Sequence, residues 1–311
     1  MTRSDRLLVG IDLGGTKIAA GLIDNTGIIV HRVTTPTPQE GSDAVLAALA
    51  STVAELARRA PCPPDAVGIA APGIVDPGSG EVRSATSTLP GWAGTPLRDE
   101  MRRLTGLPVA VDNDVRVMAL GELVYGAGRG WPDALFVSVG TGLGGAVVST
   151  GTVLAGPHHC AGSFAHLLVP ETGPIPCGCG RADHVEAVVS GPAIAAAYAV
   201  ATENRGAGPA SLSGEEVARR AANGDETARR CIHNAGAVLG RVLAGLLAAV
   251  DASIVVIGGG VAGAGPLFLD PLRDALHAEA LTPLQTVPVV PAALAGAGPL
   301  LGAAVLAGRL T

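Results

Sequence analysis

Two carboxylates on either side of an amide could remove a proton from a hydroxyl group. They are Asp112 and Asp114, with Asn113 between them, and they follow the short apolar run 108–111. In an open α/β sheet, the carboxyl end of such a strand is where reactive groups are exposed, so an aspartate there could act as a general base. Asp and Asn are also favoured helix N-caps, and the motif by itself leaves both interpretations open.

Two glycine-rich turns could bind phosphate groups. They follow apolar runs and span residues 13–17 and 140–145. Because glycine has no Cβ, the backbone N–H groups of such a turn can converge on an anion. One turn alone is better explained as a tight hairpin, but two in matched positions favour a polyphosphate. The first turn is accompanied by Asp12, Thr16 and Lys17, and Lys17 is the single lysine among 21 basic residues.

The pattern Gly-x-Gly-x-x-Gly at 140–145 and 258–263 also fits the dinucleotide fingerprint. The first copy is followed by β-prone residues rather than by a helix. Neither copy has an acidic residue closing a second strand about 20 residues further on. The sequence therefore argues against an NAD site, although the second copy, which follows an expected strand, could contact a nucleotide.

Two thiols and two imidazoles gather in a segment rich in proline and glycine, which is expected to be a loop. They are His166, Cys177, Cys179 and His184. Four nitrogen and sulfur ligands suit a closed tetrahedral zinc site, and the alternative is a free cysteine pair with incidental histidines. The other cysteines are isolated and are expected to be small buried residues; they are Cys62, Cys160 and Cys231.

Composition excludes several classes of protein. Hydrophobic residues make up 48% of the 311 residues and charged residues 15%, which excludes intrinsic disorder. The net charge of −6 argues against a nucleic-acid surface. The charge-free stretch 280–308 is long enough to span a membrane, but its prolines predict a short strand, a turn and a final apolar helix instead. Cysteine usage and the absence of a signal-peptide pattern favour the cytoplasm.

Strands and helices are expected to alternate in two α/β domains about a cleft. The expected strands are 7–12, 18–24, 28–33, 66–70, 108–112, 135–139, 146–149, 152–154 and 253–257, and the expected helices are 43–60, 95–105, 115–125, 192–202, 213–222 and 227–250. Both halves open with a strand, a glycine turn and a second strand, which indicates a weak internal duplication. Glu122, on the helix 115–125, is expected on a solvated face.

Taken together, these residues resemble the ROK family of repressors and sugar kinases, within the actin-like sugar kinase superfamily. The resemblance runs from Val9 to the last helix, and the order of its motifs is highly specific. The motifs are Gly10-Ile-Asp-Leu-Gly-Gly-Thr-Lys17, Ala71-Pro-Gly73, Val111-Asp-Asn-Asp114 with Gly121-Glu122, Ser138-Val-Gly-Thr-Gly-Leu-Gly-Gly145, and Cys177-Gly-Cys179-Gly180 with Glu186 and Ser190-Gly191.

The resemblance implies two actin-like, ribonuclease H-like domains flanking a cleft. Residues 1–114 are expected to form the smaller domain and 115–297 the larger domain with the zinc loop. The C-terminal helix, about 298–311, is expected to pack back onto the first domain.

The resemblance also implies roles for individual residues. Asp114 would be the catalytic base. The positions that would bind the sugar are Gly73, Thr88, Asn113, Asp114, Ser163, His166 and Glu186. Asp12 would help to place Mg²⁺, and the nucleotide would be held by Asp12, Gly14, Gly15, Thr16, Lys17, Gly140, Thr141, Gly142, Gly259 and Gly260. A structural zinc would be bound by His166, Cys177, Cys179 and His184.

Three departures from the family pattern bear on the substrate and the metal. Ser163 stands where family glucokinases carry a glutamate, and Thr88 stands where they commonly carry asparagine, so two polar sugar contacts have changed. Asp183-His184 replaces a Gly-Cys pair, which turns a Cys₃His set into Cys₂His₂, still a sound zinc site.

The expected function is an ATP- and Mg²⁺-dependent sugar kinase that phosphorylates O6 of glucose or a close hexose. The two changed sugar contacts keep open an amino sugar or a cyclitol as acceptor, and polyphosphate stays open as donor. A non-catalytic sugar sensor is a further alternative, although family repressors carry a DNA-binding extension that the residues before Leu7 leave no room for. The expected partners are a sugar and ATP, without nucleic acid or membrane, in a homodimer or homotetramer.

Overall fold

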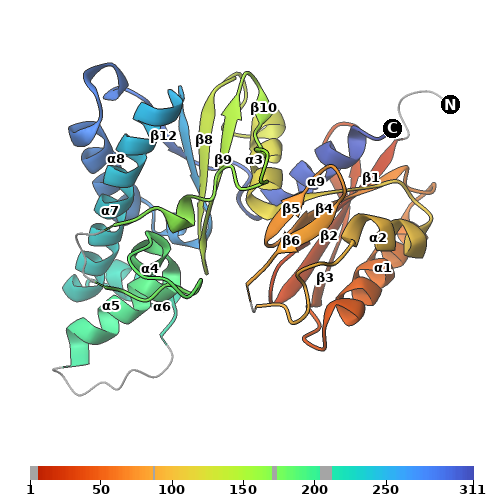
Figure 1. The fold of residues 1–311 in the computed structure, drawn as a ribbon, viewed down its shortest axis with the longest axis horizontal. Coiled ribbons are helices and arrows are strands. Elements are labelled where there is room, and N and C mark those ends of the chain that lie inside the picture. Colours follow the sequence, from red (N-terminus) through yellow and green to blue (C-terminus); the bar gives the residue numbers. More distant parts are fainter. Residues whose placement is uncertain (1–5, 87, 170–173, 204–211) are drawn as a thin grey trace. The chain divides into compact units, whose positions relative to one another are not determined.

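The chain forms two five-stranded sheets, one in each of two compact units. The computed structural model describes residues 6–86, 88–169, 174–203 and 212–311. Unit 1 contains the chain up to Gly130 together with Val153–Ala161 and Ala293–Thr311, and unit 2 contains Trp131–Thr152 and Gly162–Ala292. In each unit, helices pack against the sheet (Figure 1).

The sheet of unit 1 has the strand order β3-β2-β1-β4-β7. Its strands are β1 (Leu7–Leu13), β2 (Lys17–Asp24), β3 (Ile29–Pro36), β4 (Ala66–Ala71) and β7 (Val109–Asn113). β2 pairs antiparallel with β1 and β3, whereas β4 runs parallel to β1 and β7. β1 and β4 are buried along nearly their whole length, as expected for apolar strands covered on both faces.

Four helices pack around this sheet. They are α1 (Ser42–Arg59), α2 (Leu97–Thr105), α3 (Asp114–Tyr125) and α9 (Gly298–Gly308). The apolar residues of α1 recur every three or four positions, so one stripe of the helix faces the core. α1 and α2 share one hydrophobic cluster with the sheet, and α9 belongs to another.

α9 lies directly against two glycines of the sheet. A Cβ on Gly10 of β1 or on Gly68 of β4 would collide with the carbonyl oxygens of Leu300 and Ala303, so glycine permits this close approach. α3 in turn packs along α9. Unit 1 therefore extends beyond residue 114, where the sequence placed a boundary, because α3 stays with α9 and the sheet.

The sheet of unit 2 has the order β10-β9-β8-β11-β12. Its strands are β8 (Ala134–Val139), β9 (Leu143–Ser149), β10 (Thr152–Val153), β11 (Val255–Gly258) and β12 (Val289–Pro291). β8 pairs antiparallel with β9 and parallel with β11, as β1 pairs with β2 and β4. The two halves therefore share one strand order, which is the duplication that the sequence indicated.

The helices of unit 2 are α4 (Glu186–Val189), α5 (Gly191–Glu203), α6 (Gly214–Ala222), α7 (Glu226–Val250) and α8 (Pro266–Glu279). α7 is long and apolar enough, by length and composition, to cross a membrane, but half of its apolar stretch is buried inside the structure. It packs along α8 (Figure 1), and a core helix of a folded domain has the same properties.

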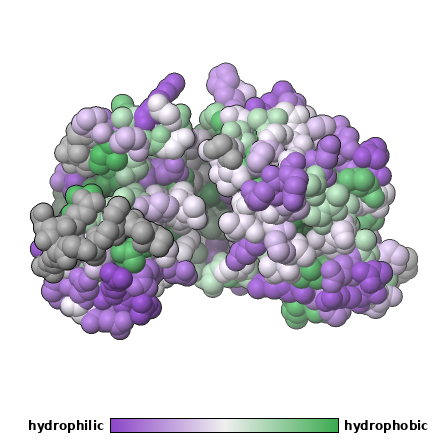
Figure 2. Space-filling view, turned by 90° about the horizontal axis from the view of Figure 1, so that it is seen from below, coloured by the Kyte–Doolittle hydropathy of each residue, from purple (hydrophilic) through white to green (hydrophobic). Residues whose placement is uncertain are grey.

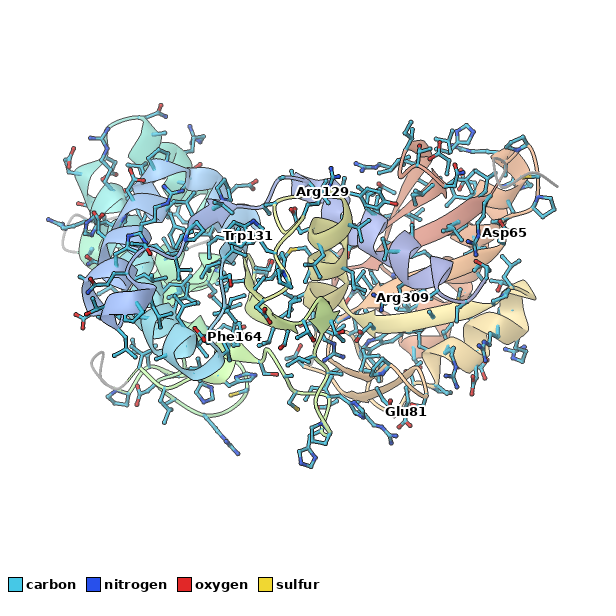
Figure 3. The ribbon with its side chains drawn as sticks, turned by 90° about the horizontal axis from the view of Figure 1, so that it is seen from above. Asp65, Glu81, Arg129, Trp131, Phe164 and Arg309 are labelled. Carbon is cyan, nitrogen blue, oxygen red and sulfur yellow. The ribbon has the colours of Figure 1, made fainter. Side chains whose placement is uncertain are left out.

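The expected strands and helices are present, with ends that differ by a few residues. The stretch 280–308 forms β12 and α9, as its prolines predicted. No residue range was predicted for α4, for α8 or for the hairpin of β5 (Ile74–Asp76) and β6 (Glu81–Ser84), on which Glu81 is labelled in Figure 3. Short 3₁₀ helices complete the description; they are η1 (Phe164–His166), η3 (Gly260–Ala264), η4 (Thr282–Leu284) and η5 (Ala295–Ala297).

Hydrophobic residues on the displayed face of Figure 2 occur in small groups among hydrophilic ones. The most exposed large hydrophobic side chains come from separate elements and loops, among them Ile28, Leu168, Val200 and Leu281. Scattered apolar residues of this kind are normal on a protein surface.

Candidate active site

The junction of β7 and α3 holds the candidate general base. Asn113 is the N-cap of α3, because its Oδ1 accepts hydrogen bonds from the amides of Val115 (3.0 Å) and Arg116 (3.2 Å). Its Nδ2 donates to Oδ1 of Asp114 (2.8 Å) and to the carbonyl oxygen of Gly73 (3.0 Å). The capping role and a role in orienting Asp114 are therefore combined in one side chain.

Asp114 is the first residue of α3 and lies close to Asp12 at the end of β1. Burial raises the pKa of Asp114, although hydrogen bonds from the Val115 amide and from Asn113 oppose this. Burial also raises the pKa of Asp12 to about 6, the negative charge of Asp114 adds to the effect, and the ammonium of Lys17 opposes it. Two close carboxylates of like charge favour a proton or a cation between them.

A magnesium ion is compatible with these residues. Mg²⁺ prefers oxygen ligands and is commonly bound through one or two carboxylates together with substrate phosphates. Asp12 offers such a carboxylate, and its raised pKa marks a position where a bound cation would relieve an electrostatic cost.

The first glycine turn joins β1 to β2, and its carbonyl groups accept hydrogen bonds from other parts of unit 1. The carbonyl oxygens of Gly14, Gly15 and Thr16 accept hydrogen bonds from the side chain of Thr37, the side chain of Gln39 and the amide of Thr37, respectively. Within the described residues, the amides of Gly15 and Thr16 have no hydrogen-bond partner. Amides left free in a turn are what an anion site requires.

Thr88 packs against this turn. A Cβ on Gly15 would collide with the Thr88 side chain, and the hydroxyl groups of Thr86 and Thr88 lie 2.9 Å apart. Gly73, with a φ of 102°, precedes β5 and is held by Asn113. Unit 1 thus brings together all the site residues predicted from its part of the chain; they are Asp12, Gly14, Gly15, Thr16, Lys17, Gly73, Thr88, Asn113 and Asp114.

The second glycine turn joins β8 to β9 in unit 2. The amide of Gly140 donates to the carbonyl oxygen of Gly142 (2.8 Å), and the carbonyl oxygen of Gly140 accepts from Gly191 at the start of α5 (2.8 Å). Gly259 has a φ of 87°, and a Cβ there would collide with the backbone of Val139. The turn 140–142 and the glycines after β11 are therefore adjacent, and Thr141 is exposed beside them.

The four potential metal ligands meet in one place. One ligand atom from each of His166, Cys177, Cys179 and His184 lies within 4.8 Å of the other three. The two histidine Nδ1 atoms are 3.3 Å apart, and Sγ of Cys179 is 3.2 Å from Nδ1 of His184. Tetrahedral zinc with Zn–N bonds of about 2.0–2.1 Å requires nitrogen atoms roughly 3.3 Å apart, so the donor set fits zinc.

Backbone bonds shape the loop that carries these ligands. The amide of Cys177 donates to the carbonyl oxygen of Arg181 (2.7 Å), and Asp183, with a φ of 62°, accepts from the amide of Ile175 (2.9 Å). Burial raises the pKa of the Cys177 thiol; a hydrogen bond from the Cys179 backbone opposes this, whereas the Cys179 thiol and the Glu186 carboxylate add to it. A bound cation would reverse the effect.

Ser163 and Glu186 lie on either side of the ligand loop in the chain. Ser163 is exposed at the start of η1. Phe164, labelled in Figure 3, packs over Gly145 of β9, where a Cβ would collide with its ring. Glu186 begins α4, and its Oε2 accepts a hydrogen bond from the amide of Leu143 (2.9 Å).

Two expectations about single residues are wrong. Glu122 is fully buried rather than solvated, because its carboxylate accepts hydrogen bonds from the amides of Ala127 (2.8 Å), Leu294 (2.9 Å) and Ala293 (3.1 Å). The isolated cysteines, which were expected to be buried, are not: Cys62 and Cys231 are half-buried and Cys160 is exposed, because they lie on or near surface loops and a helix face.

Sequence reasoning missed Arg116, whose guanidinium is buried beside Asp112. Asp112 and Arg116 are four residues apart on either side of the start of a helix, and this spacing could have predicted their contact.

Comparisons with known proteins agree with this arrangement. The ROK family model matches residues 8–309. A glucokinase from Halalkalibacterium halodurans is 34% identical over 290 residues, which cover 89% of this chain and 87% of that protein. An N-acetylmannosamine kinase from Shigella boydii serotype 18 is 40% identical over 255 residues, covering 81% and 82%.

A solved structure extends the likeness to three dimensions. The ROK family glucokinase from Streptomyces griseus, in complex with glucose and AMPPNP, superposes with a TM-score of 0.86 at 33% identity and covers 97% of this chain and 99% of that one. The match over nearly the whole chain shows that this protein belongs to the ROK family, as a sugar kinase with the actin-like two-domain fold.

Proposed function

We propose that the protein transfers the γ-phosphoryl group of ATP to O6 of glucose or a close hexose. The observation that carries this proposal is the setting of Asp114. Its carboxylate stands at a strand end, is oriented by Asn113 and the Val115 amide, and has a pKa raised by burial. A carboxylate held in this way is suited to take a proton from an acceptor hydroxyl.

In the proposed reaction, the acceptor oxygen attacks the γ-phosphorus and the bond from that phosphorus to the bridging oxygen breaks. The hydroxyl proton passes to Asp114, and ADP and the sugar phosphate leave. Such a transfer requires positioning and charge neutralisation more than covalent catalysis. The amides of Gly15 and Thr16 and the ammonium of Lys17 would bind phosphate oxygens. Asp12 would hold Mg²⁺, which supplies charge neutralisation when it is bound.

An amino sugar is the second candidate acceptor. The relative with the name N-acetylmannosamine kinase is 40% identical, against 34% for the glucokinase. Ser163 and Thr88 replace polar side chains that family glucokinases use, and Thr88 lies against Gly15 of the first turn. Because a lost hydrogen bond to a buried hydroxyl weakens discrimination strongly, a 2-acetamido sugar or a cyclitol belongs in the same assay.

One zinc ion per chain would be structural. Four protein ligands leave no open coordination position for substrate, which is the pattern of structural rather than catalytic zinc. The cytoplasm and a homodimer or homotetramer stay predictions from the sequence and the family.

A panel assay tests this proposal. Purified protein is incubated with Mg-ATP, or with polyphosphate and Mg²⁺, and with glucose, mannose, N-acetylmannosamine, glucosamine or a cyclitol, and the sugar phosphates are identified by mass spectrometry. We expect ATP-dependent formation of a hexose 6-phosphate. Turnover of the 2-acetamido sugar alone would move the assignment to an amino-sugar kinase. A folded protein that phosphorylates none of these acceptors would support the sensor alternative and contradict the proposal.

A further inference from the structure

A buried arginine ties three segments of unit 1 together. Arg116, in the first turn of α3, is 2% exposed. Its Nε donates to Oδ1 of Asp112 (2.7 Å), its Nη2 to the carbonyl oxygen of Val75 (2.8 Å) and its Nη1 to the carbonyl oxygen of His159 (2.9 Å). Every nitrogen of the guanidinium therefore has a partner on a different segment.

Two of these segments carry candidate sugar-binding residues. Asp112 directly precedes Asn113, and the Asp112 oxygen that binds Arg116 also accepts the Asn113 amide (2.7 Å). Asn113 in turn binds Asp114 and the carbonyl oxygen of Gly73. Val75 lies two residues beyond Gly73, on β5. A continuous set of hydrogen bonds thus connects the guanidinium with the proposed base and with Gly73.

The third segment, Val153–Ala161, packs with unit 1 although its chain neighbours belong to unit 2. It is attached to β5 twice. Arg116 holds the His159 carbonyl, and Nε2 of the His159 ring lies 3.6 Å from Oδ1 of Asp76, at the end of β5. His159 has a φ of 58°, in the left-handed region that glycine adopts freely and that few other residues adopt.

Only arginine can make this set of contacts. A buried guanidinium is costly unless all of its donors are satisfied, and here one carboxylate and two carbonyl groups satisfy it. Lysine could keep the charge beside Asp112, but its single nitrogen cannot replace three guanidinium nitrogens that each donate to a different segment. The arrangement therefore serves geometry rather than charge alone.

We propose that Arg116 is a positioning residue for the acceptor sugar: it aligns Asn113, Asp114 and Gly73 by holding Asp112, β5 and the segment 153–161 in one arrangement. The inference rests on the proposed function, because it assigns Arg116 to the same site. Arg116 itself does not touch the acceptor. Its hydrogen bonds reach Asp112, Val75 and His159 rather than the first glycine turn, so its loss should affect the sugar and not ATP.

The test compares Arg116→Lys and Arg116→Met with the wild-type enzyme on its preferred acceptor. We expect Arg116→Lys to raise the sugar KM at least tenfold and to lower kcat at least tenfold, with an ATP KM within twofold of wild type. A merely structural role would lower the melting temperature and leave both sugar parameters unchanged. A folded Arg116→Lys enzyme with wild-type sugar KM and kcat overturns the proposal, and this variant decides the question even if Arg116→Met does not fold.

His159→Gly is the matched control. It removes the ring contact with Asp76 but keeps the carbonyl group that binds Arg116, and glycine accepts the positive φ. We expect its sugar KM to stay within threefold of wild type. If His159→Gly raises the sugar KM and lowers kcat as much as Arg116→Lys does, the effect belongs to the imidazole and the proposal is overturned. If the wild-type enzyme turns over no acceptor, the proposed function fails instead, so the two failures are distinguishable.

Discussion

The carboxylate of Glu186 accepts a hydrogen bond from the backbone amide of Leu143, with 2.9 Å between Oε2 and the nitrogen. Glu186 follows the metal-ligand loop, and Leu143 begins β9 directly after the second glycine turn. The other carboxylate oxygen lies 3.9 Å from Sγ of Cys177. One oxygen of a residue predicted to bind sugar therefore supports the turn predicted to bind phosphate.

This hydrogen bond predicts different kinetic effects for two substitutions of Glu186. In Glu186→Gln the side-chain carbonyl can still accept the Leu143 amide, so we expect a raised sugar KM and an ATP KM close to wild type. Glu186→Ala leaves that amide without its partner, and we expect the ATP KM to rise as well, by about tenfold. Steady-state kinetics in both substrates measure the split, with the exposed Glu226→Gln on α7 as control. An unchanged ATP KM in Glu186→Ala would mean that the bond does not support the turn.

Lys17 is the single lysine of the chain and lies exposed at the start of β2. A compact ammonium on a flexible stem differs from a planar guanidinium in how it approaches phosphate oxygens. We expect Lys17→Arg to raise the ATP KM severalfold and Lys17→Ala to raise it further, with little effect on the sugar KM. Arg103→Lys, an exposed residue of α2, is the control. Wild-type ATP kinetics in Lys17→Arg would make the lone lysine an accident of composition.

Asp12 should couple stability to pH. Its pKa is about 6 in the folded protein against 3.8 ordinarily, so the folded state holds the proton more tightly than the unfolded chain does. The stabilisation from that proton is complete below pH 3.8 and is lost as the pH rises to about 6. The side chain in Asp12→Asn cannot ionise, so this variant should not lose stability as the pH rises. Its free energy of unfolding should exceed that of wild type by up to about 3 kcal/mol at pH 7.

Denaturant unfolding of both ligand-free proteins from pH 4 to pH 8 measures this difference. It should grow with pH up to about 7, although Asp12→Asn loses kinase activity. A difference in unfolding free energy that is constant across the range would contradict the raised pKa.

Zinc should stabilise the loop 175–183. We expect one zinc per chain in the purified protein, and its loss in Cys179→Ser and His184→Ala, with a lower melting temperature and faster proteolysis within the loop. Cys231→Ser, a half-buried cysteine on α7 away from the cluster, should keep the metal. Metal analysis that finds no zinc in active wild-type protein would refute the assignment.

The regular elements were predictable because their signals are local. β1 and β8 are apolar runs that end at glycine turns, and α1 carries an apolar stripe, so periodicity was sufficient. The β5–β6 hairpin has strands of three and four residues, too short for any periodicity to be visible.

The site was only partly predictable because its side chains depend on distant backbone groups. The metal ligands are close in the chain, so their spacing indicated the cluster. Glu122 was placed on a solvated face because a charged helix residue is normally exposed, but its partners Ala293 and Leu294 are 171 and 172 residues away. The carbonyl groups that bind Arg116 are 41 and 43 residues away from it in the sequence, and no local sequence pattern predicts these contacts.

The most direct measurement of the proposed chemistry is the kcat of Asp114→Asn on the preferred sugar, together with calorimetric binding of that sugar and of ATP. The substitution keeps the shape of the side chain and removes its ability to take a proton. We expect kcat to fall by about 10²–10⁴-fold, with both affinities within threefold of wild type. An Asp114→Asn enzyme that keeps more than about a tenth of the wild-type kcat would contradict the assignment of Asp114 as the general base.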